Sequence, residues 1–422
     1  MTVLFGWVDW PGLGRWARPH AVPLVLFGAA AVCVAVGMWL LRNEQAPRPP
    51  AARMSWWVVT GAAVVVIVVA WAATSWLYGE AAAAKDPGAA KADAIKTGLG
   101  IGAGTTGIFA LLLAVRRQWH NELDAAEKNV TELYIKAADQ LGSDQAPVRL
   151  AGLYALERLA HNNLGQRQSI VNVLCAYLRM PYTPPDETLP LDTDPGTQRT
   201  DHQSRVQERE VRLAAQRILT DHLRPADRGE FWDGIDLDLS NAQLINFDLR
   251  AGRVSNGRFV GATFTGDALF GEATFSGAWF VGATFSGDAR FQRATFTTAL
   301  FDGATFTAGA LFREAAITGD AIFRGATFIG NARFQGAIFT CGAWFSSSTF
   351  TGDARFHGAT FTGDAYFGGA VFTGDAWFDG ATFSAAAQFE ATFARRPSFE
   401  HATMNAGLTG LQLGDDKPGV DG

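Results

Sequence analysis

The chain contains little of the chemistry that catalysis or metal binding requires. Its 422 residues include only three cysteines, and their spacing suggests no disulfide framework. The seven histidines are scattered, and none pairs with a cysteine or a second histidine at metal-ligand spacing. No P-loop, G-x-S-x-G or H-E-x-x-H motif is present. These absences predict a protein that is not an enzyme and that has no catalytic residue, cofactor or metal site.

Charge of either sign is also sparse. Charged residues make up 18% of the chain, and the net charge is −6. Because a nucleic-acid-binding protein needs a basic surface, this balance predicts no nucleic-acid partner. Between residues 235 and 404, fifteen acidic residues stand against eleven arginines and no lysine, so this region is only mildly acidic.

What the chain does have is a long phenylalanine repeat. From Phe259 to Phe389 a phenylalanine recurs every five or six residues, and Ile317 takes the place of one of them. Aliphatic residues five apart lead into the repeat from upstream. A period of five fits neither a helix, with 3.6 residues per turn, nor a strand, with a period of two. It predicts a square coil in which each of four short sides points one large apolar residue inward.

This pattern resembles the pentapeptide-repeat family over roughly residues 235–404. The resemblance implies a right-handed quadrilateral β-helix, a solenoid with four five-residue units in each coil. The sequence departs from the family's step from about Phe312 onward, where spacings of five and six alternate. The additional residue falls in Gly-Asp steps such as Gly352-Asp353, and these residue types tolerate the turns and bulges that an insertion demands. Two such units of eleven predict a coil of 22 residues.

A 22-residue coil aligns residues 22 apart into ladders. Each coil rises about 4.8 Å, so roughly eight coils give a rod roughly 40 Å long. Phe323, Phe345 and Phe367 are expected to form one inner column. Asn331 and Asp353 would also stack, and like charges in such a ladder repel each other at roughly 5 Å. Bound calcium and solvated Asx turns both explain the ladder, and the absence of glycine-rich calcium-binding nonapeptides favours the turns.

Three long uncharged stretches precede the repeat and predict transmembrane helices. They lie at about 21–41, 55–79 and 97–115, and each supplies the roughly 20 residues that a bilayer core requires. The third is the weakest because five glycines lower its hydropathy. A signal peptide followed by one anchor is the alternative, but the first stretch lacks a convincing cleavage site. Residues 1–117 are therefore predicted to form a multi-pass domain in the cell membrane, with the lipid bilayer as a partner.

Basic residues divide almost evenly between the two sides of this membrane domain. The loops on each side carry five arginines or lysines, so their count alone gives no orientation. Arg116 and Arg117 directly follow the third stretch, and the cysteines show no pairing that would indicate an oxidising compartment. We therefore predict that the C-terminal part lies in the cytoplasm.

The segment 118–232 is predicted to be a helical part between membrane and repeat. Its apolar periodicity indicates four helices, at 123–141, 146–160, 169–179 and 205–223. A stretch rich in proline, threonine and aspartate at 182–201 predicts a flexible loop. The helices are expected to cap the open N-terminal edge of the solenoid, which spans 233–405 and is followed by a disordered tail at 406–422. The whole layout resembles that of actinobacterial multi-span proteins with a C-terminal pentapeptide-repeat solenoid.

The residue just before each inward phenylalanine points outward and varies most. At a 22-residue offset two rows form on opposite faces, one of Ile322, Trp344 and Tyr366, the other of Arg333, Arg355 and Trp377. Tryptophan, tyrosine and arginine are favoured at binding hot spots. Aromatic ladders can also simply stabilise neighbouring strands. The candidate partner-binding residues are Trp344, Tyr366, Trp377, Arg333 and Arg355.

These features together predict a membrane-anchored, non-enzymatic scaffold or protein-binding module whose partner is a protein of unknown identity. The family resemblance implies two further expectations. Some members resemble duplex DNA and protect a topoisomerase, which is the alternative function, although the mild charge and the membrane segments argue against it. Members often pair end to end, which here implies a homodimer through the C-terminal coil near Phe399.

Overall fold

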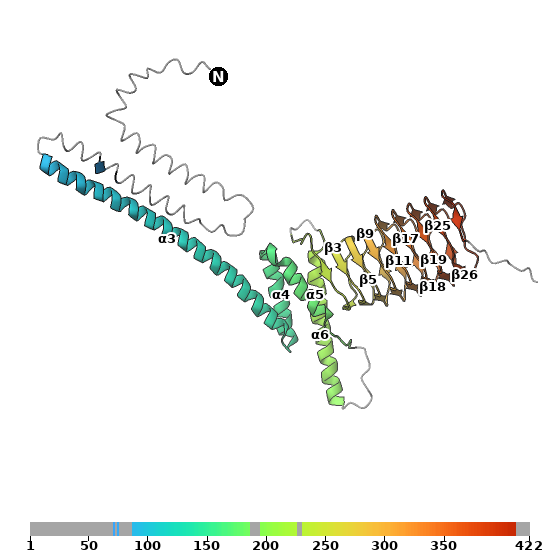
Figure 1. The fold of residues 1–422 in the computed structure, drawn as a ribbon. Helices are drawn as coiled ribbons and strands as arrows, with labels where there is room; N and C mark the ends of the chain where they lie inside the picture. Colours follow the sequence, from blue (N-terminus) through green and yellow to red (C-terminus); the bar gives the residue numbers. More distant parts are fainter. Residues whose placement is uncertain (1–70, 72–73, 76–86, 186–194, 226–229, 411–422) are drawn as a thin grey trace, which may run out of the picture. The chain divides into compact units, whose positions relative to one another are not determined.

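The computed structural model describes residues 71, 74–75, 87–185, 195–225 and 230–410 (Figure 1). The chain divides into two compact units, Met1–Glu127 and Lys128–Gly422. The first predicted membrane span and nearly all of the second lie outside the described residues, as does 411–422, most of the predicted tail.

The first long element is α3, which runs from Pro87 to Leu141 without a break. It contains both the predicted third membrane span, 97–115, and the predicted helix 123–141. Within the residues that the structure describes, no helix is long and apolar enough to cross a membrane. The predicted third span therefore has no support from the structure.

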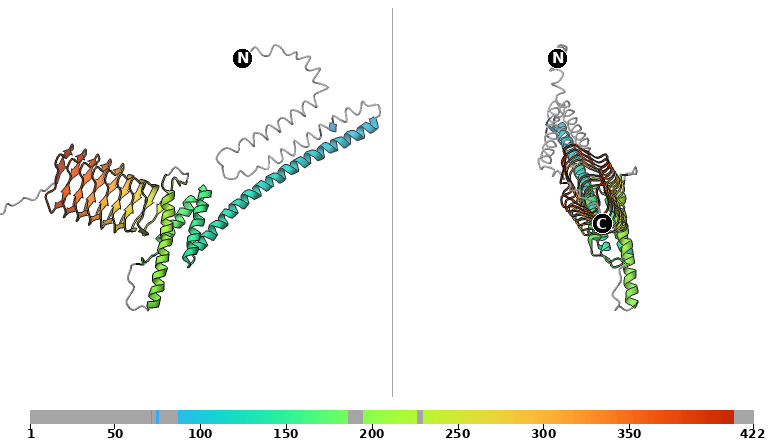
Figure 2. Two further views of the ribbon diagram at one scale, coloured as in Figure 1. Left: turned by 180° about the vertical axis from the view of Figure 1, so that it is seen from behind. Right: turned by 90° about the vertical axis from the view of Figure 1, so that its right-hand side faces the viewer.

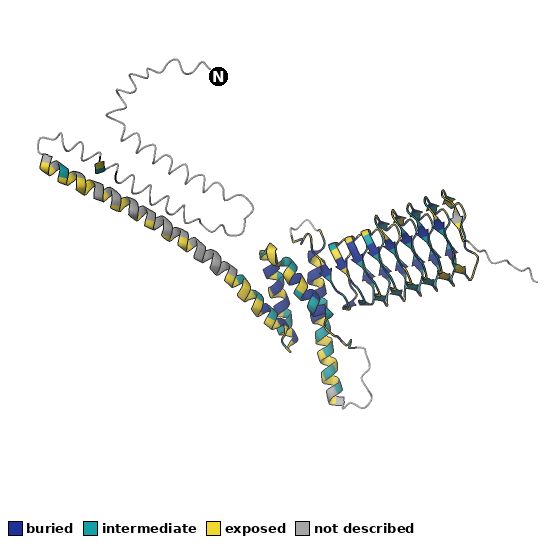
Figure 3. Cartoon of the chain, viewed as in Figure 1, coloured by how far each residue is buried: buried dark blue, intermediate teal, exposed yellow. Residues whose placement is uncertain are grey.

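Three α-helices and one short 3-10 helix follow, and they pack together through apolar faces. These elements are α4 (Ala146–Asn162), η2 (Leu164–Gln166), α5 (Arg167–Arg179) and α6 (Pro195–His222). Figure 3 shows their buried residues on the sides that face one another. The end of α3 joins them because Gly152 of α4 lies so close that an added Cβ would be 2.8 Å from the carbonyl oxygen of Ala137. We call α4, η2, α5 and α6 the cap.

The predicted loop at 182–201 is too long at its C-terminal end. Residues 195–201 belong to α6, which begins at Pro195. Proline suits the first position of a helix because its missing N–H would have no partner there. The part of the predicted loop at 186–194 lies outside the described residues.

Residues 237–409 form a square solenoid of short parallel strands, whose coils stack one behind another (Figure 2). We number its four faces in chain order within a coil. Three strands continue around the corner between faces 1 and 2: β3 (Arg253–Arg258), β6 (Thr274–Trp279) and β9 (Thr295–Leu300). Face 1 also contains β12 (Ala316–Ile317), β16 (Ile338–Phe339), β20 (Thr360–Phe361), β24 (Thr382–Phe383) and β27 (Thr403–Met404). Face 2 also contains β1 (Leu237–Asp238), β13 (Ala321–Ile322), β17 (Ala343–Trp344), β21 (Ala365–Tyr366), β25 (Ala387–Gln388) and β28 (Leu408–Thr409).

Faces 3 and 4 are separate sheets. Face 3 has eight strands, one for each turn: β2 (Gln243–Ile245), β4 (Thr263–Thr265), β7 (Thr284–Phe285), β10 (Thr305–Phe306), β14 (Thr327–Phe328), β18 (Thr349–Phe350), β22 (Val371–Phe372) and β26 (Thr392–Phe393). Face 4 has six strands: β5 (Ala268–Leu269), β8 (Ala289–Arg290), β11 (Ala310–Leu311), β15 (Ala332–Arg333), β19 (Ala354–Arg355) and β23 (Ala376–Trp377). The strand β28 lies beyond the predicted end of the solenoid at residue 405.

The length of the coil changes along the rod. Paired residues are 20 apart between β1 and β3, 21 apart between β6 and β9, and 22 apart between β13 and β17. The predicted 22-residue coil is therefore confirmed for the second half of the repeat. The additional residue explains why the long strands β3, β6 and β9 give way to pairs of short ones, since a Thr-Gly-Asp bend now separates faces 1 and 2.

Two kinds of corner close the square. After faces 2 and 4 the chain makes a tight turn, as where the amide of Ala326 donates to the carbonyl of Phe323 at 3.1 Å and Gly325 has a φ of 61°. A positive φ at this position defines a type II turn. The Gly-Asp corners differ, because Gly352 has no positive φ. Instead, a Cβ on Gly352 would lie 2.6 Å from the carbonyl carbon of Gly330 in the previous coil. The expected conformational reason for glycine is thus wrong there, and close stacking of the coils is the cause.

The core is a set of phenylalanine columns. The rings of Phe323 and Phe345 stack with their centroids 4.9 Å apart and their planes 2° apart, and Phe367 continues the column at 5.1 Å. Rings from neighbouring columns meet edge to face, as Phe323 and Phe334 do at 5.6 Å. All these rings are fully buried. The predicted inner ladder is confirmed, and each coil depends on its two neighbours for burial.

The cap closes the N-terminal edge of the solenoid, as predicted. The side-chain amide of Gln216 in α6 both donates to the carbonyl of Ile245 and accepts from its amide, each at 2.9 Å. Gln168 of α5 makes the same pair of bonds with the backbone of Asp236, at 2.9 and 3.0 Å. Each glutamine thereby takes the place of the strand that a further coil would have provided.

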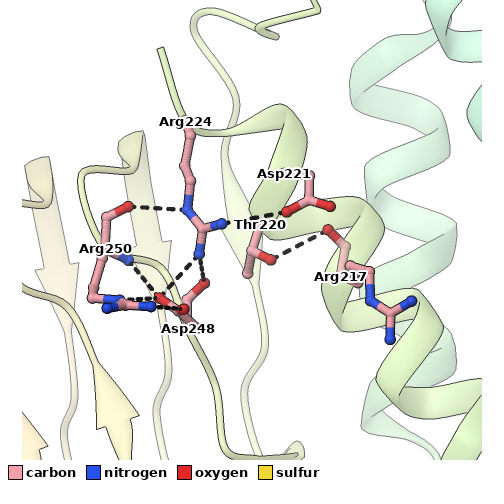
Figure 4. Close-up of polar contacts among 6 residues, drawn as sticks. All are labelled: Arg217, Thr220, Asp221, Arg224, Asp248 and Arg250. Atoms are coloured by element: carbon pink, nitrogen blue, oxygen red, sulfur yellow. Dashed lines mark hydrogen bonds and ion pairs between the residues drawn. The ribbon is translucent and has the colours of Figure 1, made fainter. Parts of the chain in front are cut away.

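An arginine seals a third side of the first coil. Figure 4 shows Arg224, just beyond the end of α6, reaching Asp248 and Arg250. Its guanidinium donates to the carbonyl of Asp248 at 2.6 Å and to that of Arg250 at 3.1 Å. It also forms an ion pair with the Asp248 carboxylate at 3.0 Å, which Arg250 shares at 2.7 Å. The cap is therefore specific to the backbone of the first coil.

Candidate interaction surface

Face 2 carries an unbroken row of large apolar side chains. Its outward residues on five successive turns are Trp279, Leu300, Ile322, Trp344 and Tyr366, each paired with the next across the parallel strands. Arg258 precedes this row and Gln388 follows it. We call these five residues the face 2 row. It extends over roughly 19 Å, given a rise of about 4.8 Å per coil.

The aromatic rings of the face 2 row lie against the rod and are partly buried. Trp344 and Tyr366 stack with centroids 5.8 Å apart and planes 14° apart. The indole of Trp344 crosses Gly342, where an added Cβ would come within 2.2 Å of the ring. The Tyr366 hydroxyl donates to the Asp364 carboxylate at 3.0 Å, and this bond raises the pKa of the phenol. The row therefore presents a fixed apolar surface.

The row on face 4 has a different character. Arg333 pairs with Leu311 on one side and Arg355 on the other, and Trp377 follows Arg355. The Arg355 guanidinium lies 5.0 Å from the centre of the Trp377 ring and forms an ion pair with Asp353 at 3.3 Å. These contacts are within the rod and occupy both groups.

The five predicted partner-binding residues therefore do not form one surface. Trp344 and Tyr366 lie together on face 2, whereas Arg333, Arg355 and Trp377 lie on the opposite face 4. A single partner contacting one flat face would meet only one of these groups. Whether either group binds a partner stays a prediction.

Carboxylates border the face 2 row. Asp320 and Asp364 lie two residues before Ile322 and Tyr366, and Asp320 is exposed and has no ion pair among the described residues. On the other border Asp302 faces Arg324 at 4.0 Å, the longest ion-pair distance in the solenoid. Burial raises the pKa of Asp302, and Arg324 opposes this effect. With Glu390 beyond Tyr366, the border of the row is acidic.

The aspartate ladder near face 4 is neutralised from within. The Asn331 side chain accepts a hydrogen bond from the amide of Asp353 at 3.0 Å, and Asp353 accepts one from Asp375 at 3.4 Å. Arg355 and Arg395 then pair with Asp353 and Asp375. This arrangement agrees with Asx-type corners. In the part of the chain that the structure describes, no group of three or more His, Cys, Asp or Glu could hold a metal ion.

A cavity of about 680 Å³ lies beside the first coils. Its lining includes four arginines, of which Arg224 and Arg250 pair with Asp248, Arg290 with Asp267 and Asp288, and Arg293 with Glu272. Every cation of the cavity is thus engaged by a carboxylate. The cavity offers no uncompensated charge to an anionic ligand.

The two described cysteines are both free. Cys175 is buried in the cap, and burial raises the pKa of its thiol to about 12, so it is not a nucleophile at neutral pH. Cys341 is exposed, and its thiol donates to the carbonyl of Thr318 at 3.2 Å. Its role as a tolerated corner residue stays a prediction.

Sequence reasoning missed Trp279 and Leu300 as members of the face 2 row. The predicted 22-residue offset does not connect Trp279 to Leu300, because their coil has 21 residues. Counting the spacings of five and six between Phe275 and Phe296 would have given 21 and would have placed both residues in the row.

Comparison with known proteins bears on the solenoid alone. Residues 259–305, 301–349 and 345–392 match the family model described as pentapeptide repeats (9 copies). No curated protein and no solved structure matches the chain. The resemblance of the whole layout to actinobacterial membrane proteins is therefore not shown. Repeat solenoids of this kind are generally structural or binding modules without enzymatic activity. The C-terminal region of this chain is a pentapeptide-repeat β-solenoid.

Proposed function

We propose that the chain is a non-enzymatic, membrane-anchored scaffold whose solenoid binds a partner protein along the face 2 row. The observation that carries this proposal is the row itself: five large apolar side chains on consecutive turns, partly exposed and fixed in place. Single apolar residues on a surface are ordinary, but a contiguous apolar stripe bordered by polar groups is typical of an interaction site.

Face 2 is the better candidate of the two outward rows. On face 4, Arg355 is already held by Trp377 and Asp353, so a partner would have to displace internal contacts. On face 2 the apolar side chains lose water when a partner covers them, and nothing has to be broken first. Arg333, Arg355 and Trp377 are therefore assigned to the stability of the rod.

The membrane anchor and the orientation rest on the sequence. The uncharged stretches 21–41 and 55–79 support the anchor, and Arg116 and Arg117 support a cytoplasmic solenoid. Cys341, which is exposed, gives the test of orientation. A membrane-impermeant maleimide should label Cys341 in lysed cells and not in intact cells, and Cys341→Ser should abolish this labelling. Labelling of intact cells at Cys341 would place the solenoid outside.

Two expectations from the family resemblance remain as lesser proposals. The open C-terminal coil near Phe399 supports a homodimer through the end of the rod, which the mass of the purified protein in solution tests. Protection of a topoisomerase by imitating DNA has less support, because arginines pair with many of the carboxylates that such a mimic would present. Inhibition of a supercoiling reaction by the chain at micromolar concentration would revive it.

The binding role is tested by cross-linking in intact cells. A photo-reactive residue in place of Gln388 extends the face 2 row, and one in place of Ser398 extends the face 4 row. We expect a defined protein to be captured from Gln388 and not from Ser398. The triple variant W279A/W344A/Y366A should lose this product, whereas Trp377→Ala should retain it. Equal capture from both positions, or capture that survives the triple variant, would contradict the proposal.

A further inference from the structure

We propose that the face 2 row binds an amphipathic α-helix whose apolar stripe is bordered by lysine or arginine. This inference rests on the proposed function, since it identifies the class of partner that the same surface takes. Three observations carry it: the backbone of face 2 has no free groups, the row has the spacing of helical turns, and its border is acidic.

The state of the backbone excludes an added strand on this face. The amide of Phe323 donates to the carbonyl of Trp344 at 2.7 Å, and the amide of Phe345 donates to that of Tyr366 at 2.7 Å. Successive coils thus use one another's hydrogen bonds, and a strand lying on face 2 would leave its own backbone unpaired. A helix satisfies its backbone internally and binds through side chains alone.

The spacing of the row matches a helix laid along the rod. The five residues from Trp279 to Tyr366 repeat about every 4.8 Å, and one helical turn rises about 5.4 Å. Over roughly 19 Å the two periods drift apart by only about 2 Å, which side-chain rotamers absorb. A helix of about 14 residues covers the row and places one apolar residue of each turn against one coil.

The charge of the border selects the flanks of that helix. Asp320 and Asp364 lie on one side of the row, Asp302 and Glu390 lie toward the other, and Arg324 is the one cation among them. Lysine and arginine extend their apolar stems along an interface and keep their charges at its edge, where they meet these carboxylates. Like charge repels a helix with glutamate flanks. Acidic border charges act mainly on the rate of association, so binding is expected to weaken with salt.

Two synthetic peptides test the proposal directly. Both are 18-residue helices with leucine at positions i, i+3, i+4 and i+7, one flanked by lysine and the other by glutamate. Binding of each labelled peptide to the full-length chain in zwitterionic nanodiscs is measured by fluorescence anisotropy, with empty nanodiscs as the blank. We expect the lysine peptide to bind at least about tenfold more tightly than the glutamate peptide.

Variants then locate the site. Trp344→Ala should weaken binding of the lysine peptide by about tenfold or more, as expected of an aromatic anchor. The matched change Trp377→Ala on face 4 should leave it unchanged. Asp320→Lys alters an exposed side chain without an ion pair, so folding is preserved, and the preference for the lysine peptide should fall.

The outcomes separate this inference from the proposed function. Equal affinity for the two peptides, or equal loss in the face 2 and face 4 variants, would overturn the helix proposal. The cross-linking at Gln388 could still succeed in that case, which would leave face 2 as a binding surface for a partner of another kind. Failure of that cross-linking together with failure of the peptides would remove both.

Discussion

The cap and the solenoid bury their apolar surfaces in opposite ways. The solenoid repeats one contact, a phenylalanine stacked on its counterpart in the next coil, along its whole length. The cap relies on contacts that occur once, such as the paired bonds of Gln216 with Ile245. The rod should therefore be robust because its contacts are many, whereas its N-terminal end depends on a few individual side chains.

The largest effect should follow from opening the repeated core. Phe334 is fully buried and stacks on Phe312 and Phe356, each at 4.9 Å. Phe334→Ala removes the ring from the middle of a column, and we expect it to lower the free energy of unfolding by about 3–5 kcal/mol. Urea unfolding followed by far-ultraviolet circular dichroism measures the loss.

Phe399 provides the matched control for this change. Its partly buried ring stacks on Phe378 at 4.9 Å, and no described ring follows it in the column. Phe399→Ala should therefore cost clearly less than Phe334→Ala. Equal losses at the two positions would show that the rod does not depend on neighbouring coils in the way that its stacking indicates.

A smaller and more local effect is expected at the cap. Gln216 is buried, and Gln216→Leu leaves the amide and the carbonyl of Ile245 without partners, at a cost of about 1–3 kcal/mol. Hydrogen exchange should rise in the first coil around 243–245 and stay unchanged around 349–351. The exposed pair of Gln168 with Asp236 is the control, and Gln168→Leu should have less effect because water can replace the lost bonds. Equal exchange along the whole rod would contradict a local role.

The sequence predicted the rod because the rod is a repetition. A phenylalanine at every fifth or sixth position is a signal that many residues share, so the faces, the columns and the row of Ile322, Trp344 and Tyr366 follow from spacing alone. The start of that row at Trp279 was lost because one residue fewer in the coil shifts the register. A uniform offset cannot describe a solenoid whose coil grows along its length.

The cap was predicted in its existence and not in its chemistry. Apolar periodicity gave α4, α5 and most of α6, but no spacing indicates that Gln216 meets Ile245 or that Gln168 meets Asp236. Each is a single side-chain contact between residues 29 or 68 positions apart, with no second copy in the sequence to reveal it. The acidic border of face 2 likewise depends on which carboxylates the arginines leave unpaired, and only the folded chain decides that.

His222 holds the cap to the first coil through both of its ring nitrogens. Its Nε2 lies 2.9 Å from the Glu157 carboxylate and its Nδ1 lies 2.9 Å from the carbonyl of Glu230. The ring stacks on Trp232, with centroids 4.1 Å apart, and Arg167 lies over the other aromatic partner at 5.9 Å. Both nitrogens face acceptors, so the arrangement is fully satisfied only when both carry a proton.

The smallest effect should therefore appear as a dependence of the cap on pH. Burial alone lowers the pKa of His222, but the bonds to Glu157 and the Glu230 carbonyl outweigh it and raise the pKa above 6.5. Stabilisation by the charged ring is thus complete below the ordinary pKa of about 6.5 and is lost as pH rises through the raised value. Hydrogen exchange at 235–238 should increase between pH 6 and pH 9, corrected for intrinsic rates, by an amount on the order of 1 kcal/mol. His222→Gln cannot titrate and should remove this dependence; a pH response that persists in the variant would assign it to another group.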